Sequence, residues 1–439
     1  MSEVLPRGDI RASVVRDAAL PGLDPHPSPL PKARQGVVRT FLPWVVAAAL
    51  AVVLPYLVPG GFGLSLLCRM GISIVFALSF NMLLGQGGML DFGHAVFLGL
   101  GGYLAMHAMR QTGWPLPLPL VPIIGGVGGL VAALLAGWVA TRRSGTAFAM
   151  ITLGVAELAV ATVHLFPRVF GGEEGVSGDR SNGPALFGHD FGSQIEAYYL
   201  IAAFAWLCAL LMWAYTATPL GRLANAVRDN PERVSFLGYD PARIRRVVFT
   251  LSGLFAGVAG GLAALNDEIV TASGMGADAS GNVLLMTFIG GIGTFWGPVA
   301  GAVLITFLAV ALSTLTDAWQ LYSGLLFVAM VVWAPGGISG VILAHAPLGG
   351  RIASLVPRYA AVAPGLVLAL AGTTGLAELA FRLQAVRNGA TPRPLLGLAA
   401  NPETAGPWLL AAVLFVAGAV LLRLTYPAAR DAWRAAASA

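Results

Sequence analysis

Long apolar segments recur at close intervals along this chain, and each is about as long as a lipid bilayer is thick. A helix of about 20 residues crosses a hydrocarbon core of about 30 Å. The 439 residues are 57% hydrophobic and only 11% charged, whereas a soluble domain is about 25% charged. A water-soluble protein this apolar could not cover its surface with polar groups. The sequence therefore predicts an all-α, polytopic integral membrane protein with roughly ten crossings.

The apolar segments divide the chain into three regions. Residues 1–39 are polar and rich in Pro and Arg, which is typical of a largely disordered tail. A transmembrane core is expected at 40–345, and an extension at 346–439 adds about two further apolar spans. The separate spans are predicted at 41–59, 64–84, 96–110, 116–140, 146–166, 197–216, 247–266, 283–313, 319–334, 359–380 and 407–425.

The arginines between the spans predict the orientation of the chain. Cytoplasmic loops carry the excess of basic residues, which places the N-terminus, Arg142–Arg143 and the loop 217–246 in the cytoplasm. The segment 267–281 holds acidic side chains and no basic one, and we expect it on the outer side.

The apolar stretch 283–313 is too long for one straight span. A single helix over these residues would extend about 46 Å, against a core of about 30 Å. The sequence GGIGTFWGP interrupts the stretch, and Pro298 is unfavourable inside a helix. We therefore predict a broken or re-entrant helix pair, whose turn must be shielded by protein or line a water-filled cavity.

The single lysine of the chain, Lys32, lies in PLPKARQ. A Walker A loop ends in Gly-Lys-Ser/Thr to hold phosphates, so any ATP that drives this protein is expected to be bound by a partner chain. No cofactor and no metal is expected in the chain itself. The sequence also lacks the HExxH and GxSxG patterns that would favour a membrane-embedded enzyme.

Six ordered blocks of sequence carry a resemblance to a known family. The blocks are NMLLGQGGMLDFGHAVFLGLGGYLAM (81–106), FAMITLGVAEL (148–158), RVFGGEEGVSG (168–178), PLGRLANAVRDNPERVSFLGYD (219–240), LLMTFIGGIGTFWGPVAGAVL (284–304) and VVWAPGGISGVI (331–342). Together they make the chain similar, over about 41–343, to the LivM-like permeases of branched-chain amino acid ATP-binding cassette (ABC) importers.

The resemblance implies the fold of a type II ABC importer permease, in which two permease subunits line a central path. It also implies ABC ATPase subunits, a second related permease subunit and a periplasmic substrate-binding protein as partners, all at the bacterial inner membrane. By resemblance, the cargo is a branched-chain or other small amino acid. Related permeases carry urea, amides or small carboxylic acids, and these remain alternatives.

The basic loop 217–246 resembles the coupling loop on which the ATPases dock. Pro219 suits the first turn of a short amphipathic helix, and Gly238 suits the turn that ends it. The family pattern of Glu-Ala-Ala, three residues and Gly is matched here by Glu232 and Gly238, without the two alanines. The residues expected to couple to the ATPases are Arg222, Arg228, Glu232, Gly238 and Tyr239.

Polar residues inside or beside the spans are candidates for the translocation path. An ionisable group in a membrane costs about 2.5–3.5 kcal/mol on insertion scales and is often functional. Each candidate also has a structural explanation, such as folding a turn, packing helices or satisfying backbone groups. The path and hinge candidates are Asn81, Gln86, Asp91, His94, Glu157, Thr294, Trp296, Gly297 and Pro298.

A secondary transporter driven by an ion gradient is the main alternative to the importer. In that case Asp91 and Glu157 would be proton or sodium sites. Uptake by the chain alone in liposomes would favour it, whereas co-purification with an ATPase would favour the importer.

Overall fold

The computed structural model describes residues 37–58, 60–110, 117–182, 184, 191–316, 318–346, 352–389 and 401–438. The chain divides into two compact units, Met1–Leu50 and Ala51–Ala439, and the second contains every described helix from residue 61 onward. Most of the predicted tail, up to residue 36, falls outside the described residues.

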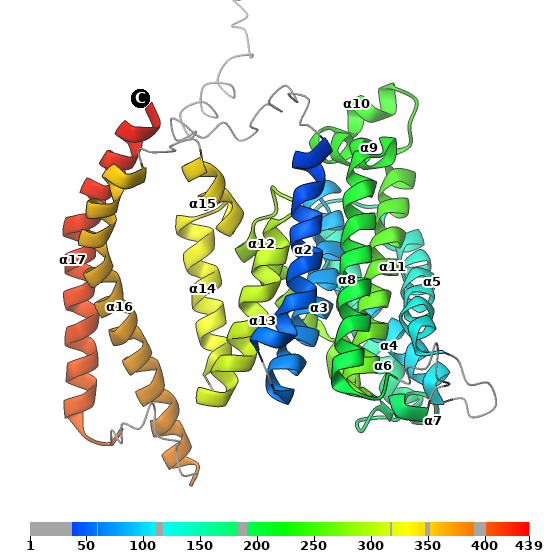
Figure 1. Cartoon of the computed structure of the whole chain (residues 1–439), viewed down its shortest axis with the longest axis horizontal. Helices are drawn as coiled ribbons and strands as arrows, with labels where there is room; N and C mark the ends of the chain where they lie inside the picture. Colours follow the sequence, from blue (N-terminus) through cyan, green and yellow to red (C-terminus); the bar gives the residue numbers. More distant parts are fainter. Residues whose placement is uncertain are drawn as a thin grey trace, which may run out of the picture. The chain divides into compact units, whose positions relative to one another are not determined.

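The described residues are overwhelmingly helical, which confirms the predicted fold class (Figure 1). The α-helices are α2 (Val37–Leu57), α3 (Gly61–Asn81), α4 (Ala95–Arg110), α5 (Val121–Ala140), α6 (Thr146–Leu165), α7 (Pro167–Phe170), α8 (Gln194–Ala217), α9 (Pro219–Asp229), α10 (Pro231–Phe236), α11 (Pro241–Asp267), α12 (Ala277–Gly290), α13 (Gly297–Leu315), α14 (Trp319–Trp333), α15 (Gly337–His345), α16 (Ile352–Arg387) and α17 (Ala405–Ser438). Shorter elements are the π-helix η1 (Met82–Gln86), the 3₁₀ turns η2 (Leu118–Leu120), η3 (Arg180–Asn182) and η4 (Ala272–Met275), and the strands β1 (Val176–Ser177) and β2 (Ile269–Val270).

Eight helices among the described residues are long and apolar enough to cross a membrane, or up to nine when the bent pair α14–α15 counts as one span. The predicted number of roughly ten is therefore too high by this criterion. Helices α4 and α12 have 16 and 14 residues. They extend only about 24 and 21 Å, less than a hydrocarbon core of about 30 Å.

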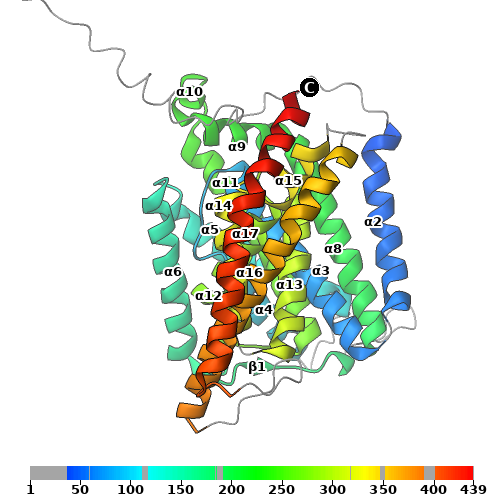
Figure 2. The ribbon, with the colours of Figure 1, turned by 90° about the vertical axis from the view of Figure 1, so that its left-hand side faces the viewer.

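The second unit has two distinct ends. Figure 1 shows α9 and α10 at the upper end and α7 at the lower end, and Figure 2 shows β1 at that same lower end. Strand β1 pairs antiparallel with β2, with Val176 opposite Val270. Helix α11 joins the two ends, because it begins soon after α10 and stops just before β2. We call them the α9–α10 end and the β1–β2 end.

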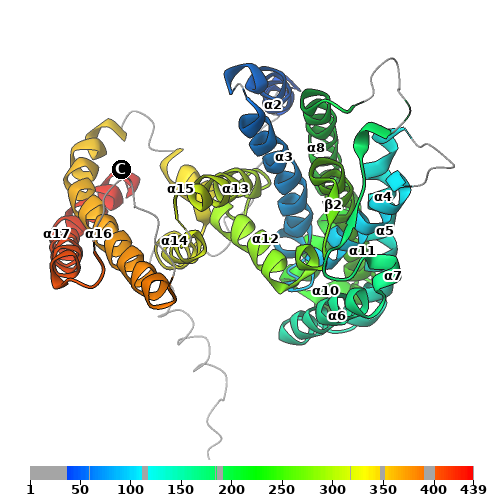
Figure 3. The same cartoon turned by 90° about the horizontal axis from the view of Figure 1, so that it is seen from below.

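Helix α11 is the most buried of the candidate spans, and it packs against α4 and α5 (Figure 3). Glycines make this contact possible. A Cβ placed on Gly129 of α5 would lie 2.6 Å from the Cα of Gly257, and one on Gly125 would lie 2.8 Å from the Cα of Gly261. Small residues let backbones approach this closely in membrane helices, so the centre of the unit is a contact between main chains.

The basic loop differs from its prediction. One amphipathic helix was expected, but the structure has two, α9 and α10, which meet at Asn230. Pro231 has no N–H to continue the helix, and the Asn230 side chain accepts from the Arg233 N–H at 2.9 Å and starts a new one. Helix α11 also starts six residues before the predicted span, since Asp240 caps it and Pro241 fits its first turn.

The predicted break within 283–313 is confirmed. Helix α12 ends at Gly290 and α13 begins at Gly297. The turn between them lies against a second break, between α14 and α15, where the helices bend by 43°. A Cβ on Gly337 would lie 2.5 Å from the Cα of Gly291. The two non-helical turns therefore pack against each other through glycine backbones.

The extension contains two long helices, α16 and α17, which pack against each other. Both helices extend beyond the two ends of the predicted spans, 359–380 and 407–425. The buried carboxylate of Glu378 on α16 accepts hydrogen bonds from the hydroxyls of Thr316 and Tyr322. These bonds satisfy a carboxylate that would be costly to bury alone.

The glycine contact predicts the first testable outcome. Gly257→Leu should lower the apparent Tm of the detergent-solubilised protein and broaden its elution profile, because the side chain has no space between α11 and α5. Gly154→Leu on α6 is the matched control, since a Cβ there meets no atom within 4 Å. Equal melting of the two variants, measured by fluorescence-detected size exclusion after heating, would contradict the described packing.

Candidate functional site

Two segments that the sequence singled out separately are in contact. The guanidinium of Arg228, on α9, donates through Nη1 to the carbonyl oxygen of Gly85 in η1. Gly88, with φ +64°, lets the chain pass beside Arg228, because a Cβ there would lie 3.2 Å from the Arg228 Cβ. The guanidinium also bonds Asp229 at 3.0 Å. Helix α9 is thus attached to the irregular backbone that follows α3.

Two buried carbonyl oxygens lie in this irregular segment. The side-chain oxygens Oδ1 of Asn81 and Oε1 of Gln86 are buried and have no hydrogen-bond partner among the described residues. A buried acceptor left unsatisfied costs about 1–3 kcal/mol. A π-helical segment with unsatisfied amides is a feature often found at functional sites.

A buried set of hydrogen-bonded polar groups connects the turn after η1 to α3. Asp91, His94 and Ser79 are all fully buried. His94 Nδ1 lies 3.3 Å from Asp91 Oδ2, and His94 Nε2 lies 2.9 Å from Ser79 Oγ. Phe76 stacks on the imidazole with ring centroids 5.3 Å apart. The Gly93 N–H donates to the other Asp91 oxygen at 2.8 Å, so Asp91 both folds the turn and orients the imidazole.

The hydrogen bonds of Ser79 determine the role of His94 Nε2 in this set of polar groups. Ser79 Oγ donates to the Phe76 carbonyl at 2.7 Å, so it must accept from His94 Nε2. The imidazole therefore bridges the Ser79 hydroxyl and the Asp91 carboxyl within a site closed to solvent.

The predicted coupling residues lie at the α9–α10 end. Helix α9 buries one face, made by Gly221, Ala224 and Val227, and leaves Arg222 exposed. Glu232 is exposed on α10. Gly238 has φ +84°, a left-handed conformation that favours glycine, and it ends the helix as predicted. Exposed apolar side chains flank that turn: Phe236 is 89% exposed, Leu237 69% and Tyr239 51%.

The remaining candidates lie in two other places. Thr294 Oγ1 accepts from the Gly297 N–H at 3.0 Å, and Pro298 occupies the first turn of α13, so these residues form the helix joint beside Trp296. Glu157 lines an open cavity of about 480 Å³ with His164, Glu173 and Asp278. That cavity does not include Asp91, so the two carboxylates of the ion-driven alternative are not brought together.

The β1–β2 end is held by polar contacts that the sequence reasoning missed. Arg180 donates to Gln194 at 2.8 Å and forms an ion pair with Glu268 at 3.4 Å. Hydrogen bonds from the hydroxyl and N–H of Ser181 hold the pKa of the Asp179 carboxyl below its usual value. The loop after α7 is thereby tied to the end of α11.

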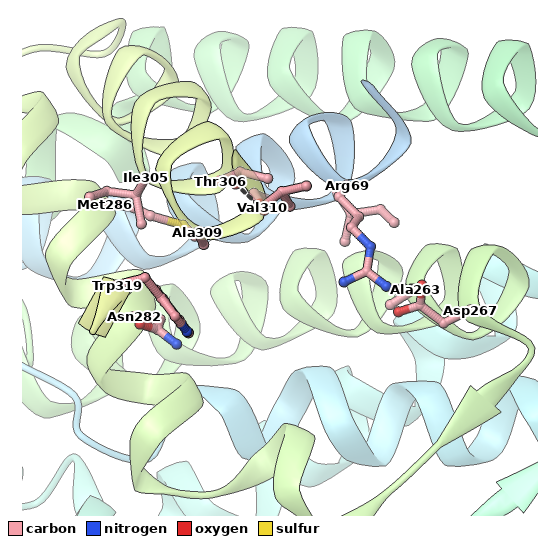
Figure 4. Close-up of a pocket in the computed structure, with 12 residues that line it drawn as sticks. Arg69, Ala263, Asp267, Asn282, Met286, Ile305, Thr306, Ala309, Val310 and Trp319 are labelled. Atoms are coloured by element: carbon pink, nitrogen blue, oxygen red, sulfur yellow. Dashed lines mark hydrogen bonds and ion pairs between the residues drawn. The ribbon is translucent and has the colours of Figure 1, made fainter. Parts of the chain in front are cut away.

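The reasoning from sequence also missed a pocket at this end. Arg69 of α3 and Asp267 of α11 form an ion pair at 3.0 Å on its wall. Figure 4 shows the guanidinium of Arg69 directed at Asp267 across the pocket from Trp319. The sequence did contain a signal for this pocket, because Arg69 is a charged residue inside a predicted span, where burying a charge is energetically costly.

The fold is that of an all-α, multi-pass membrane protein, with eight candidate spans among its described residues. The chain matches the family described as "Branched-chain amino acid transport system / permease component" over residues 63–335. It therefore belongs to this family of transport permeases, which confirms the resemblance.

Individual relatives agree with the family match. The high-affinity branched-chain amino acid transport system permease protein LivM of Salmonella typhimurium is 27% identical over 70% of this chain and 77% of its own length. The LivM protein of Escherichia coli matches to the same extent. A probable LivH permease of Methanocaldococcus jannaschii is 25% identical over 57% of this chain and 83% of its own length. No solved structure matches the chain.

The buried Asp91 predicts a loss of stability. Asp91→Ala should lower the apparent Tm, because it leaves the Gly93 N–H and His94 Nδ1 without their partner at about 1–3 kcal/mol for each group. Glu157→Ala, which removes an exposed carboxylate, should melt like the wild type. Thermal unfolding in detergent measures both, and an unchanged Tm for Asp91→Ala would contradict the network.

Proposed function

We propose that this chain is the transmembrane subunit of an ABC importer for branched-chain or other small amino acids. It forms half of the translocation path and is driven by ATPase subunits on separate chains. The family match and the names of the LivM and LivH relatives support this cargo. An autoinducer 2 import permease of Photorhabdus laumondii also matches, over 36% of this chain, so the cargo needs its own test.

The observation that carries the proposal is the contact of α9 with the irregular segment after α3. Closure of the ATPases must move a permease through rigid contacts. We call the exposed turn at the end of α10, residues 236–239, the tip. Phe236 and Leu237 give it an exposed apolar surface that an ATPase could contact, and the charged side chain of Glu232 is exposed on the same short helix. A displacement of this tip would move α9, and the hydrogen bond from Arg228 to the Gly85 carbonyl would transmit that displacement to η1.

The complete importer contains a second, related permease, two ATPases and a periplasmic substrate-binding protein. The chain is placed in the bacterial inner membrane with its N-terminus and the α9–α10 end in the cytoplasm. The basic residues of the α9–α10 end support this orientation, since excess Arg marks cytoplasmic loops. The acidic residues Asp267, Glu268 and Asp278 near the β1–β2 end agree with an outer location.

Gly238→Val should abolish ATP-driven uptake and leave the amount of protein in the membrane unchanged. Valine strongly disfavours φ +84°, so the tip would turn away from the ATPase, whereas Gly238→Asn should retain most uptake because Asn tolerates this conformation. Gly145→Val is the matched control, with φ +66° and open space around it. Transport of radiolabelled leucine into proteoliposomes is the measurement, and normal uptake by Gly238→Val would refute the coupling role.

Arg228→Ala should separate ATP hydrolysis from transport. The ATPases would still dock on the unchanged tip, but α9 would no longer hold the Gly85 carbonyl. We expect ATP hydrolysis within about twofold of the wild type and uptake lowered at least tenfold, a difference of about 1.4 kcal/mol. Arg143→Ala in the loop after α5, with its exposed side chain, is the comparison for a change of charge alone. Parallel loss of hydrolysis and uptake in Arg228→Ala would argue against this link.

A further inference from the structure

The pocket at the β1–β2 end has a volume of about 210 Å³ and lies among α3, α11, α12, α13 and α14. Its walls differ in chemistry. Arg69 and Asp267 form a charged side, and Ile305, Met286 and Trp319 line the opposite, mostly apolar side, where Asn282 lies next to Trp319 (Figure 4). Ser73 and Thr306, also on the wall, bond each other at 2.9 Å. The pocket therefore suits a ligand that carries one positive and one negative group at one end and is apolar at the other end.

The charged pair of the pocket is not explained by stability. Arg69 and Asp267 are 52% and 35% exposed, and an ion pair this exposed contributes about 0–1 kcal/mol. Arg69 lies within a candidate span, where a charge is expensive and is by default a functional hypothesis.

Asp267 is fixed in place by its neighbours. Asn266 donates to its Oδ1 at 2.8 Å, and the Gln194 amide donates to Asn266 at 3.3 Å. Arg180 holds Gln194 from the loop after α7. The carboxylate therefore faces the pocket from a supported position, and Arg69 is the more exposed member of the pair.

The pocket can be reached from the β1–β2 end. A second hollow shares Arg69, Val310 and Trp319 with it and is also lined by Phe62 and Ser65. The last two residues belong to the first turns of α3, which start at that end. The two hollows form one route from the end that we place outside to the charged pair.

We propose that this pocket is a binding site for a zwitterionic amino acid with an aliphatic side chain. The Arg69 guanidinium donates to the α-carboxylate, which it suits as a planar donor. The Asp267 carboxylate accepts from the α-ammonium, and the aliphatic side chain contacts the apolar wall. The ligand replaces the Arg69–Asp267 bond with two bonds of the same kind. The assignment rests on the proposed function, because it deepens the cargo of the same importer.

Binding is tested without ATP or the binding protein. The full-length chain, in nanodiscs with the subunits that co-purify, is titrated with radiolabelled leucine in a scintillation proximity assay. Isopentylamine and 4-methylpentanoate, which lack the carboxylate or the ammonium, should compete at least tenfold more weakly than leucine. Asp267→Asn and Arg69→Gln should each weaken leucine binding at least tenfold. Arg430→Gln, which removes an ion pair with Asp431 on α17, should leave binding unchanged.

The charge-reversed double variant Arg69→Asp with Asp267→Arg separates recognition from structure. It keeps an ion pair but exchanges the charges relative to the apolar wall, so leucine binding should stay weak while the elution profile remains normal. Restored binding in this variant would overturn the proposal, as would equal binding by the wild type and both single variants, or absent binding by the wild type. ATP-driven uptake by the wild-type importer is measured separately, so a failure of the proposed function is recognised independently.

Discussion

The contact of α11 with α4 and α5 through glycines is the interaction on which the other features depend. Between lipid-exposed helices there is no hydrophobic driving force, so association depends on close packing of small residues. Gly257 and Gly129 bring two main chains together without side chains between them. Helix α11 is thereby held in a buried position, and it positions both α9 and α10, which precede it, and Asp267 at its end.

Irregular backbone lies at two of the candidate sites of this molecule, after α3 and between α12 and α13. A membrane protein tolerates non-helical turns only where protein or water satisfies them, and each break here is covered. The break after Gly290 lies against Gly337, and the segment around Gly85 is covered by Arg228. The difference between them is chemical. The first is closed by glycine backbones and forms a packed joint, whereas the second is closed by the long side chain of Arg228 from α9.

The sequence predicted those features that depend on local patterns. The spans at 96–110, 146–166 and 319–334 agree with α4, α6 and α14 to within one residue at each end, because apolar length alone determines them. The break in 283–313 followed from its length and glycines. Contacts between distant segments were beyond such patterns: no local signal pairs Arg228 with Gly85, Asp267 with Arg69, or β1 with β2. The division of the basic loop into α9 and α10 at Asn230 was not predicted. The pattern of charged and apolar residues indicated one amphipathic helix, and the Asn230-Pro231 pair, which caps a new helix, was given less weight.

Helix α3 connects the two ends in a way that suggests how coupling and binding are linked. In its N-terminal half it carries Arg69, and the π-helical segment that continues its far end carries Gly85. A helix transmits displacement along its axis as a rigid element, so a pull on Gly85 through Arg228 also shifts Arg69. Asp267 belongs to α11, which the glycine contact holds in place. In the importer that we propose, a displacement of α9 would change the Arg69–Asp267 separation, and a bound zwitterion would be gripped or released as this separation changes.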